Sequence, residues 1–204
     1  MIFYVSRILL LSVICFLAVV GIRKSKIARK KVVCALAVFL CFASVTVSAV
    51  FPVENLFTYF GSPESVFNYT HFGKTNDVIC GKNSCMVIYT DHSNTGGHYI
   101  VPKTEKGCRI PGYFYAKRIS HKFDKNGSFD VYKASGTDDC YIVGVIISDS
   151  SEPEIVDNRN EPVENTVIKM GDTDTYTVIV YAYTENFSND YCLYIDGVNT
   201  AIAD

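Results

Sequence analysis

The pattern of hydrophobic and polar positions divides the chain into two parts. The first part holds two long apolar runs, residues 8–22 with fifteen uncharged residues and residues 32–51 with twenty. At ~1.5 Å per helical residue, the second run is about 30 Å long, which matches the hydrocarbon core of a bilayer. The first run reaches about 33 Å if the helix starts at residue 1 and Arg7 extends to the headgroups. The pattern predicts two transmembrane helices, at about residues 2–22 and 32–51.

A strongly basic segment, residues 23–31, separates the two apolar runs. Its sequence RKSKIARKK contains six basic residues: Arg23, Lys24, Lys26, Arg29, Lys30 and Lys31. Segments rich in Lys and Arg stay on the cytoplasmic side of a membrane, so both helices are expected to cross outward from this loop. Residues 1–51 are therefore predicted to anchor the protein in the plasma membrane. The lipid bilayer is its first expected partner, and the rest of the chain is expected outside the cytoplasm.

Two other interpretations of the first fifty residues stay open. A helical hairpin buried in a water-soluble core is disfavoured, because these residues include no Asp or Glu. A signal peptide would use residues 23–31 as its basic region and residues 32–45 as its apolar region. Small residues at Val47 and Ala49 suit a cleavage site, and cleavage after Ala49 would secrete the remainder. The anchor and the signal peptide both export the same residues.

Residues 52–76 are predicted to form a juxtamembrane link and a short helix. The link carries aromatic residues that suit the membrane interface, namely Phe57, Tyr59 and Phe60. Ser62 is a good N-cap, and Pro63 suits the first helical position. The helix is expected to end before Gly73. Its expected apolar face consists of Val66, Phe67 and Tyr69.

Residues 77–204 predict an exported, β-rich domain. Nine short runs are rich in Val, Ile, Tyr, Phe and Thr and are separated by Gly, Asn and Asp. These runs are residues 77–80, 85–91, 98–103, 113–123, 128–134, 140–148, 166–170, 175–183 and 191–196. With no long helical pattern between them, they predict a mainly β fold, either an antiparallel sandwich or a curled meander. The run 140–148 is apolar on both faces, so we expect it at the centre of a sheet.

The widest break in the β pattern is the acidic segment 148–165. It contains six acidic residues, one basic residue and two prolines. Its composition predicts an exposed loop. About forty residues follow it, which are few for an independent core, so we expect one domain rather than two.

Five of the eight cysteines lie on the expected exported side: Cys80, Cys85, Cys108, Cys140 and Cys192. In the sequence VICGKNSCMVI, a two-residue turn at Lys82 and Asn83 would place Cys80 opposite Cys85. Opposite residues of a strand pair come within disulfide range, and disulfides persist outside the cytoplasm. Two reduced cysteines on a strand pair are the alternative. Since five is odd, at least one thiol stays free or pairs between molecules.

Charge and motifs restrict the functions that the domain can have. The first fifty residues carry seven basic residues, whereas the other 154 carry all 21 acidic residues and 12 basic ones. A net charge near −9 makes the exported domain a poor ligand for nucleic acid. No sequence motif for a serine nucleophile, a phosphate-binding loop or a metalloprotease is present, so no catalytic residue, metal ligand or cofactor is assigned.

Four residues are candidates for a ligand site. His92 and His98 flank one turn in the sequence DHSNTGGH, beside Asp91. They could form a metal cluster, although a polar loop with Gly96 and Gly97 at positive φ explains the sequence better. Tyr113 and Tyr115 alternate with other aromatic and basic residues in YFYAKR. That run suits a stacking surface, or a strand with one buried face.

The sequence therefore predicts a membrane-anchored, extracytoplasmic binding or interaction module. Its partner would be a protein or a cell-surface ligand. The alternatives are a small regulatory or inhibitory subunit of a membrane complex, and an enzyme of unrecognised type with a site built from loops. An enzyme predicts a deep polar cleft that contains a titratable pair, whereas a flat or aromatic surface favours the module.

Overall fold

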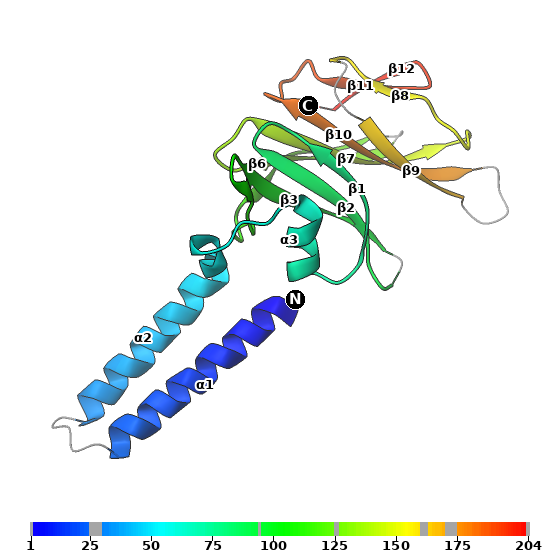
Figure 1. Cartoon of the computed structure of the whole chain (residues 1–204). Helices are drawn as coiled ribbons and strands as arrows, with labels where there is room; N and C mark the ends of the chain where they lie inside the picture. The colour runs from blue at the N-terminus through cyan, green and yellow to red at the C-terminus, as the bar shows by residue number, and fades with distance from the viewer. Residues whose placement is uncertain are drawn as a thin grey trace.

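The computed structural model describes residues 2–24, 30–93, 95–124, 127–159, 163–169 and 175–202. Two helices, α1 (Ile2–Lys24) and α2 (Lys30–Val50), pack side by side as a hairpin that projects from a β-rich body (Figure 1). Both expected helices are thus present, and their bounds differ from the expected ones by at most two residues. Lys26 and Arg29 of the basic segment lie outside the described residues.

The structure does not support the predicted transmembrane tether. Within the described part of the chain, no helix combines the length and the apolar character that a membrane crossing requires.

The link after α2 contains a 3-10 helix, η1 (Val53–Leu56), and leads into α3 (Pro63–Thr70). The Ser65 backbone N–H donates to Ser62 Oγ at 3.2 Å, which confirms the predicted N-cap. Of the expected apolar face, Val66 and Phe67 are buried, whereas Tyr69 is half exposed. The first strand follows at Lys74, three residues before the predicted start of the β-rich domain.

The described residues form three antiparallel sheets. The first sheet has the order β1 (Lys74–Cys80), β2 (Ser84–Thr90), β3 (Gly96–Thr104) and β4 (Gly107–Cys108). The central sheet has the order β5 (Ala116–Asp124), β6 (Gly127–Ala134), β7 (Asp139–Ser148), β10 (Tyr176–Glu185) and β9 (Val163–Lys169). The third sheet has the order β12 (Val198–Ala201), β11 (Cys192–Ile195) and β8 (Ile155–Asp157). The predicted mainly β, antiparallel class is confirmed.

Three details of the predicted strands are wrong. The acidic segment is not wholly a loop, because β8 lies within it and pairs with β11. Gly96 and Gly97 belong to β3 rather than to a turn, and neither has a positive φ. Tyr113 and Tyr115 precede β5, which begins only at Ala116.

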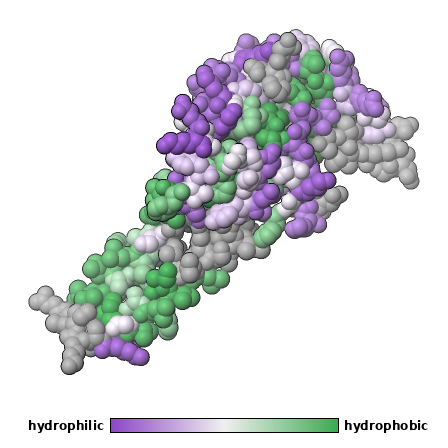
Figure 2. Space-filling view, viewed as in Figure 1, coloured by the Kyte–Doolittle hydropathy of each residue, from purple (hydrophilic) through white to green (hydrophobic). Residues whose placement is uncertain are grey.

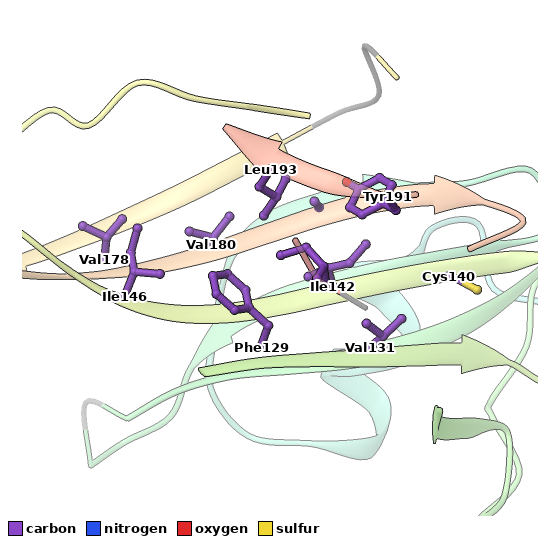
Figure 3. Packing of buried hydrophobic residues seen from close by; sticks show 11 residues of the cluster. Phe129, Val131, Cys140, Ile142, Ile146, Val178, Val180, Tyr191 and Leu193 are labelled. Atoms are coloured by element: carbon purple, nitrogen blue, oxygen red, sulfur yellow. The ribbon is translucent and has the colours of Figure 1, made fainter. Parts of the chain in front are cut away.

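The central sheet is covered on both faces. On one face, Met86 and Ile88 of β2 and Ile100 of β3 pack against Tyr141 and Tyr181. On the other face, Tyr191 and Leu193 pack over Phe129, Ile142 and Val180 (Figure 3). The outer face of the first sheet is in turn covered by α3 through Val66 and Phe67. The body therefore consists of antiparallel sheets packed in layers, with α3 on the outer face of the first sheet.

The central position predicted for residues 140–148 is confirmed. Strand β7 pairs with β6 on one side and with β10 on the other. Its Gly144 faces the ring of Phe129, and a Cβ at Gly144 would lie 2.6 Å from that ring. The absence of a side chain at Gly144 therefore lets Phe129 fill the core.

The predicted cysteine pair is also present. Cys80 and Cys85 face each other across β1 and β2 and form a disulfide. The Gly81 backbone N–H donates to the Ser84 carbonyl at 2.9 Å, which closes the two-residue turn. The other three cysteines of the body, Cys108, Cys140 and Cys192, are buried free thiols.

One buried carboxyl group, that of Asp139 on β7, joins the first sheet to the central sheet. Its Oδ2 accepts hydrogen bonds from the Asn83 backbone N–H at 2.8 Å and from Ser84 Oγ at 2.7 Å. Its Oδ1 accepts a hydrogen bond from the Tyr183 hydroxyl at 3.1 Å. Ser84 Oγ also lies 2.9 Å from the Tyr141 hydroxyl. The fully buried Asp139 thus satisfies donors from the β1–β2 turn, β2 and β10 at one point.

We predict that Asp139→Ala lowers the free energy of unfolding by about 2–4 kcal/mol, because it removes the acceptor of three hydrogen bonds, two of them from the buried hydroxyls of Ser84 and Tyr183. Denaturant titration of the protein in detergent measures this change. Asp138→Ala is the matched control, since Asp138 makes an exposed ion pair with Lys133 at 3.3 Å. The control should cost less than about 1 kcal/mol. Equal effects of the two substitutions would contradict the role of Asp139.

Candidate functional site

The structure separates the four candidate residues. His98 and Tyr113 line one cavity, His92 lines a different depression, and Tyr115 packs inside the body. No group of three metal-ligating side chains occurs among the described residues. The metal cluster considered for the turn around His92 and His98 is therefore not assembled there.

The carboxylate of Asp91 stabilises the loop around His92. Asp91 Oδ1 accepts hydrogen bonds from the Ser93 backbone N–H at 2.9 Å, Ser93 Oγ at 2.7 Å and the Thr95 backbone N–H at 2.9 Å. The bonds from Ser93 and Thr95 hold the pKa of Asp91 below its usual range. His92 itself is exposed beside an open depression of about 440 Å³. The contacts of Asp91 therefore fit a polar loop between strands.

The cavity beside His98 is small and mostly aromatic. It has a volume of about 210 Å³, and its lining comprises His98, Tyr99, Ile100, Pro111, Gly112, Tyr113, Ala116 and Tyr132. The His98 and Tyr132 rings lie 4.6 Å apart. Burial lowers the pKa of His98, so its ring is neutral at pH 7. The titratable side chains of this described lining are His98 and three tyrosines, Tyr99, Tyr113 and Tyr132.

A turn at residues 111–115, which we call the aromatic turn, presents two exposed rings beside this cavity. Tyr113 is 71% exposed, and its ring packs edge-to-face on Phe114 with 4.9 Å between the centroids. Ser135 fixes the turn, because its Oγ donates to the Phe114 carbonyl at 2.9 Å and its N–H donates to the Tyr115 carbonyl at 2.7 Å. These two hydrogen bonds hold the backbone of the turn, so the two rings are presented from a fixed backbone.

Tyr115 points in the opposite direction from Tyr113. It packs against the buried cluster that joins the first and central sheets. Burial, together with the nearby Asp139 carboxyl group, raises the pKa of Tyr115 to about 12. Tyr115 therefore belongs to the core, and only Tyr113 of the predicted aromatic pair faces outward.

A third cavity, larger than the two described above, was not predicted from the sequence. It is an open groove of about 490 Å³ between the end of β7 and the β11–β12 turn. Its lining comprises Ile146, Ile147, Ser148, Asp149, Ser150, Ile195, Asp196, Val198 and Thr200. One residue of its lining, Asp196, stabilises the fold, because its Oδ1 accepts a hydrogen bond from the Glu154 N–H at 2.9 Å. Its two halves are about fifty residues apart in sequence, so only the fold brings them together.

Comparisons with known proteins do not identify the chain. No family model matches it, and neither does a curated protein or a solved structure.

We predict that the free energy of unfolding decreases as the pH falls below 6.5, the ordinary pKa of histidine. The unfolded chain takes up a proton at His98 more readily than the folded protein, whose pKa at this residue is lowered. The stability from the neutral ring is thus fully present above pH 6.5 and is lost toward the folded-state pKa. Denaturant titrations at a series of pH values measure this decrease.

His98→Gln should make that decrease smaller. His71 keeps its own contribution in this variant, because burial lowers its pKa as well. An unchanged pH dependence in His98→Gln would contradict the assignment of His98 as a buried, neutral ring.

Proposed function

We propose that the protein is a binding module that its α1–α2 hairpin holds in the plasma membrane, with the β-rich body on the extracytoplasmic side. The observation that carries this proposal is the apolar surface that the hairpin leaves exposed. The proposed partner of the body is a protein or a cell-surface ligand.

Large apolar side chains are exposed along both helices of the hairpin. Twelve of them are at least half exposed: Leu9, Val13, Ile14, Phe16, Leu17, Val32, Leu36, Val38, Phe39, Leu40, Phe42 and Val47. Figure 2 shows hydrophobic residues gathered along the hairpin, whereas much of the body is hydrophilic. In each helix these positions point in several directions around the axis, and the other helix can cover only one of them. A helix that is apolar all round is typical of a membrane or of a large protein core.

A lipid bilayer suits this apolar surface better than the core of a large protein does. The complete run 32–51 contains twenty uncharged residues. A fully apolar helix of that length matches the hydrocarbon thickness of ~30 Å, although the described residues alone do not supply a span. The sequence and the exposed apolar side chains therefore support the proposal of two membrane crossings.

The basic residues at one end of the hairpin support the proposed orientation. Arg23 and Lys24 end α1, and Lys31 lies in the first turn of α2 with its side chain exposed. Lys and Arg are retained on the cytoplasmic side, so the opposite end of α2 would emerge outside the cell. Cleavage after Ala49 remains the alternative, and it would release the body on the same side.

The aromatic turn supports a binding role for the body. Exposed Tyr and Phe side chains on a fixed backbone bury a large area with little loss of conformational entropy. The adjacent cavity is small, at about 210 Å³, and is lined in part by tyrosine rings, which favours an aromatic binding surface over a deep polar cleft. A regulatory subunit would instead make its main contacts through the two helices.

We predict that Phe39→Asp weakens membrane attachment, because a carboxylate in mid-helix costs ~2.5–3.5 kcal/mol in a bilayer. The measurement is the fraction of protein that stays with membranes after an alkaline wash. Phe123→Asp is the matched control, since Phe123 is 78% exposed but lies on β5 of the body. Complete release of the unaltered protein by the wash would contradict membrane anchoring.

We also predict that a photo-crosslinker at Tyr113 captures a discrete partner in intact cells, whereas the same group at Phe123 does not. A second crosslinker at Phe114 should capture the same partner, because the two rings are in contact. Identical products from Tyr113 and Phe123 would show that the aromatic turn has no special role. Products from Leu36 alone would instead favour the regulatory subunit.

A further inference from the structure

The segment between α2 and α3 is fixed to the body rather than flexible. Asn55, in η1, makes two hydrogen bonds with the backbone of Ile110: its Nδ2 donates to the carbonyl at 2.8 Å, and its Oδ1 accepts from the N–H at 2.9 Å. Phe60 and Cys108 pair as an isolated antiparallel bridge, with two backbone hydrogen bonds of 2.9 and 2.8 Å. The body is therefore connected to the hairpin through a segment that is hydrogen-bonded at both ends.

This segment leaves three large apolar side chains exposed, whereas Phe60 packs against the body. Phe57 is 86% exposed, and Leu56 and Phe51 are also largely exposed. All three lie within seven residues of the end of α2, where a helix leaving a bilayer reaches the headgroup region. The double hydrogen bond of Asn55 restrains this short 3-10 turn, so these side chains cannot simply fold back into the core.

Two cations of the body contact a tyrosine of the same segment. The Arg109 guanidinium carbon lies 4.5 Å from the centre of the Tyr59 ring, and Arg109 Nη2 also donates to the Tyr59 hydroxyl. Lys106 Nζ lies 5.9 Å from the same ring, and its side chain is exposed. Aromatic rings next to Lys and Arg are typical of the membrane interface, where the rings enter the headgroup layer and the cations meet phosphate.

We propose that Phe51, Leu56 and Phe57 form an interfacial collar that enters the headgroup layer of the bilayer, with Lys106 and Arg109 facing the lipid phosphates. This inference rests on the proposed membrane function and adds a second contact to it. The collar is joined to the body through Asn55 and Phe60, so its insertion fixes the height and tilt of the body above the membrane. The occupant of this surface is thus phospholipid.

Tryptophan fluorescence tests the collar directly, because the chain contains no Trp. Three single-tryptophan proteins are compared in proteoliposomes: Phe57→Trp in the collar, Phe42→Trp in α2 and Phe123→Trp on the body. The lipids carry bromine either near the glycerol backbone or near the ends of the acyl chains. Bromine quenches tryptophan only at short range, so the pattern reports the depth of each ring.

The collar predicts that Phe57→Trp is quenched several-fold more strongly by bromine near the glycerol backbone than by bromine near the chain ends. Phe42→Trp should be quenched most by bromine within the acyl chains, and Phe123→Trp by neither. Quenching of Phe42→Trp without quenching of Phe57→Trp would overturn the collar and leave the membrane function intact. Quenching of neither would overturn the proposed function itself.

A charge variant separates phosphate contact from apolar insertion. Lys106→Gln combined with Arg109→Gln should reduce the quenching of Phe57→Trp in vesicles with anionic lipid, since the two cations no longer face phosphate. Lys122→Gln, which removes a cation from β5, is the matched control and should leave the quenching unchanged. Equal quenching in all these variants would show that Lys106 and Arg109 do not contribute to the collar.

Discussion

The packing of the first sheet on the central sheet depends on the buried carboxyl group of Asp139. It joins the β1–β2 turn and β2 to the central sheet through hydrogen bonds from Asn83, Ser84 and Tyr183. A buried carboxyl group without these donors would be strongly unfavourable, so the two sheets can pack here in only one register. The first sheet leads to β4, whose Cys108 holds the segment that joins the body to the hairpin. One polar contact in the core thus helps to place the segment before α3 relative to the central sheet.

Much of the fold was predictable because several of its elements are determined by residues that are close in sequence. The cap at Ser62, the two-residue turn before Ser84 and the doubly apolar run of β7 each depend on neighbouring residues alone. Strands β4, β8 and β12 were missed because they are only two, three and four residues long, which is too short for a local pattern to indicate a strand. They exist because longer strands offer them hydrogen-bonding partners, which is information that no local pattern contains.

The candidate site was predictable only in part, for a physical reason. Alternation in YFYAKR suggested one strand, but the structure places a turn there, so Tyr113 faces outward while Tyr115 enters the core. His98 joins Tyr113 at one cavity because β3 and the aromatic turn meet in space, whereas His92 is separated by the hydrogen bonds of its own loop. The role of Asp139 was not visible either, since an aspartate between strands is usually part of an exposed turn.

The most direct test of this account is the sidedness of the two parts in intact cells. A membrane-impermeant thiol reagent is applied to Ser93→Cys on the body and to Ser25→Cys in the basic segment, and the buried native thiols of the body serve as background. The account predicts that Ser93→Cys is labelled at once and that Ser25→Cys is labelled only after the membrane is permeabilised. Labelling of Ser25→Cys in intact cells, with Ser93→Cys protected, would contradict it.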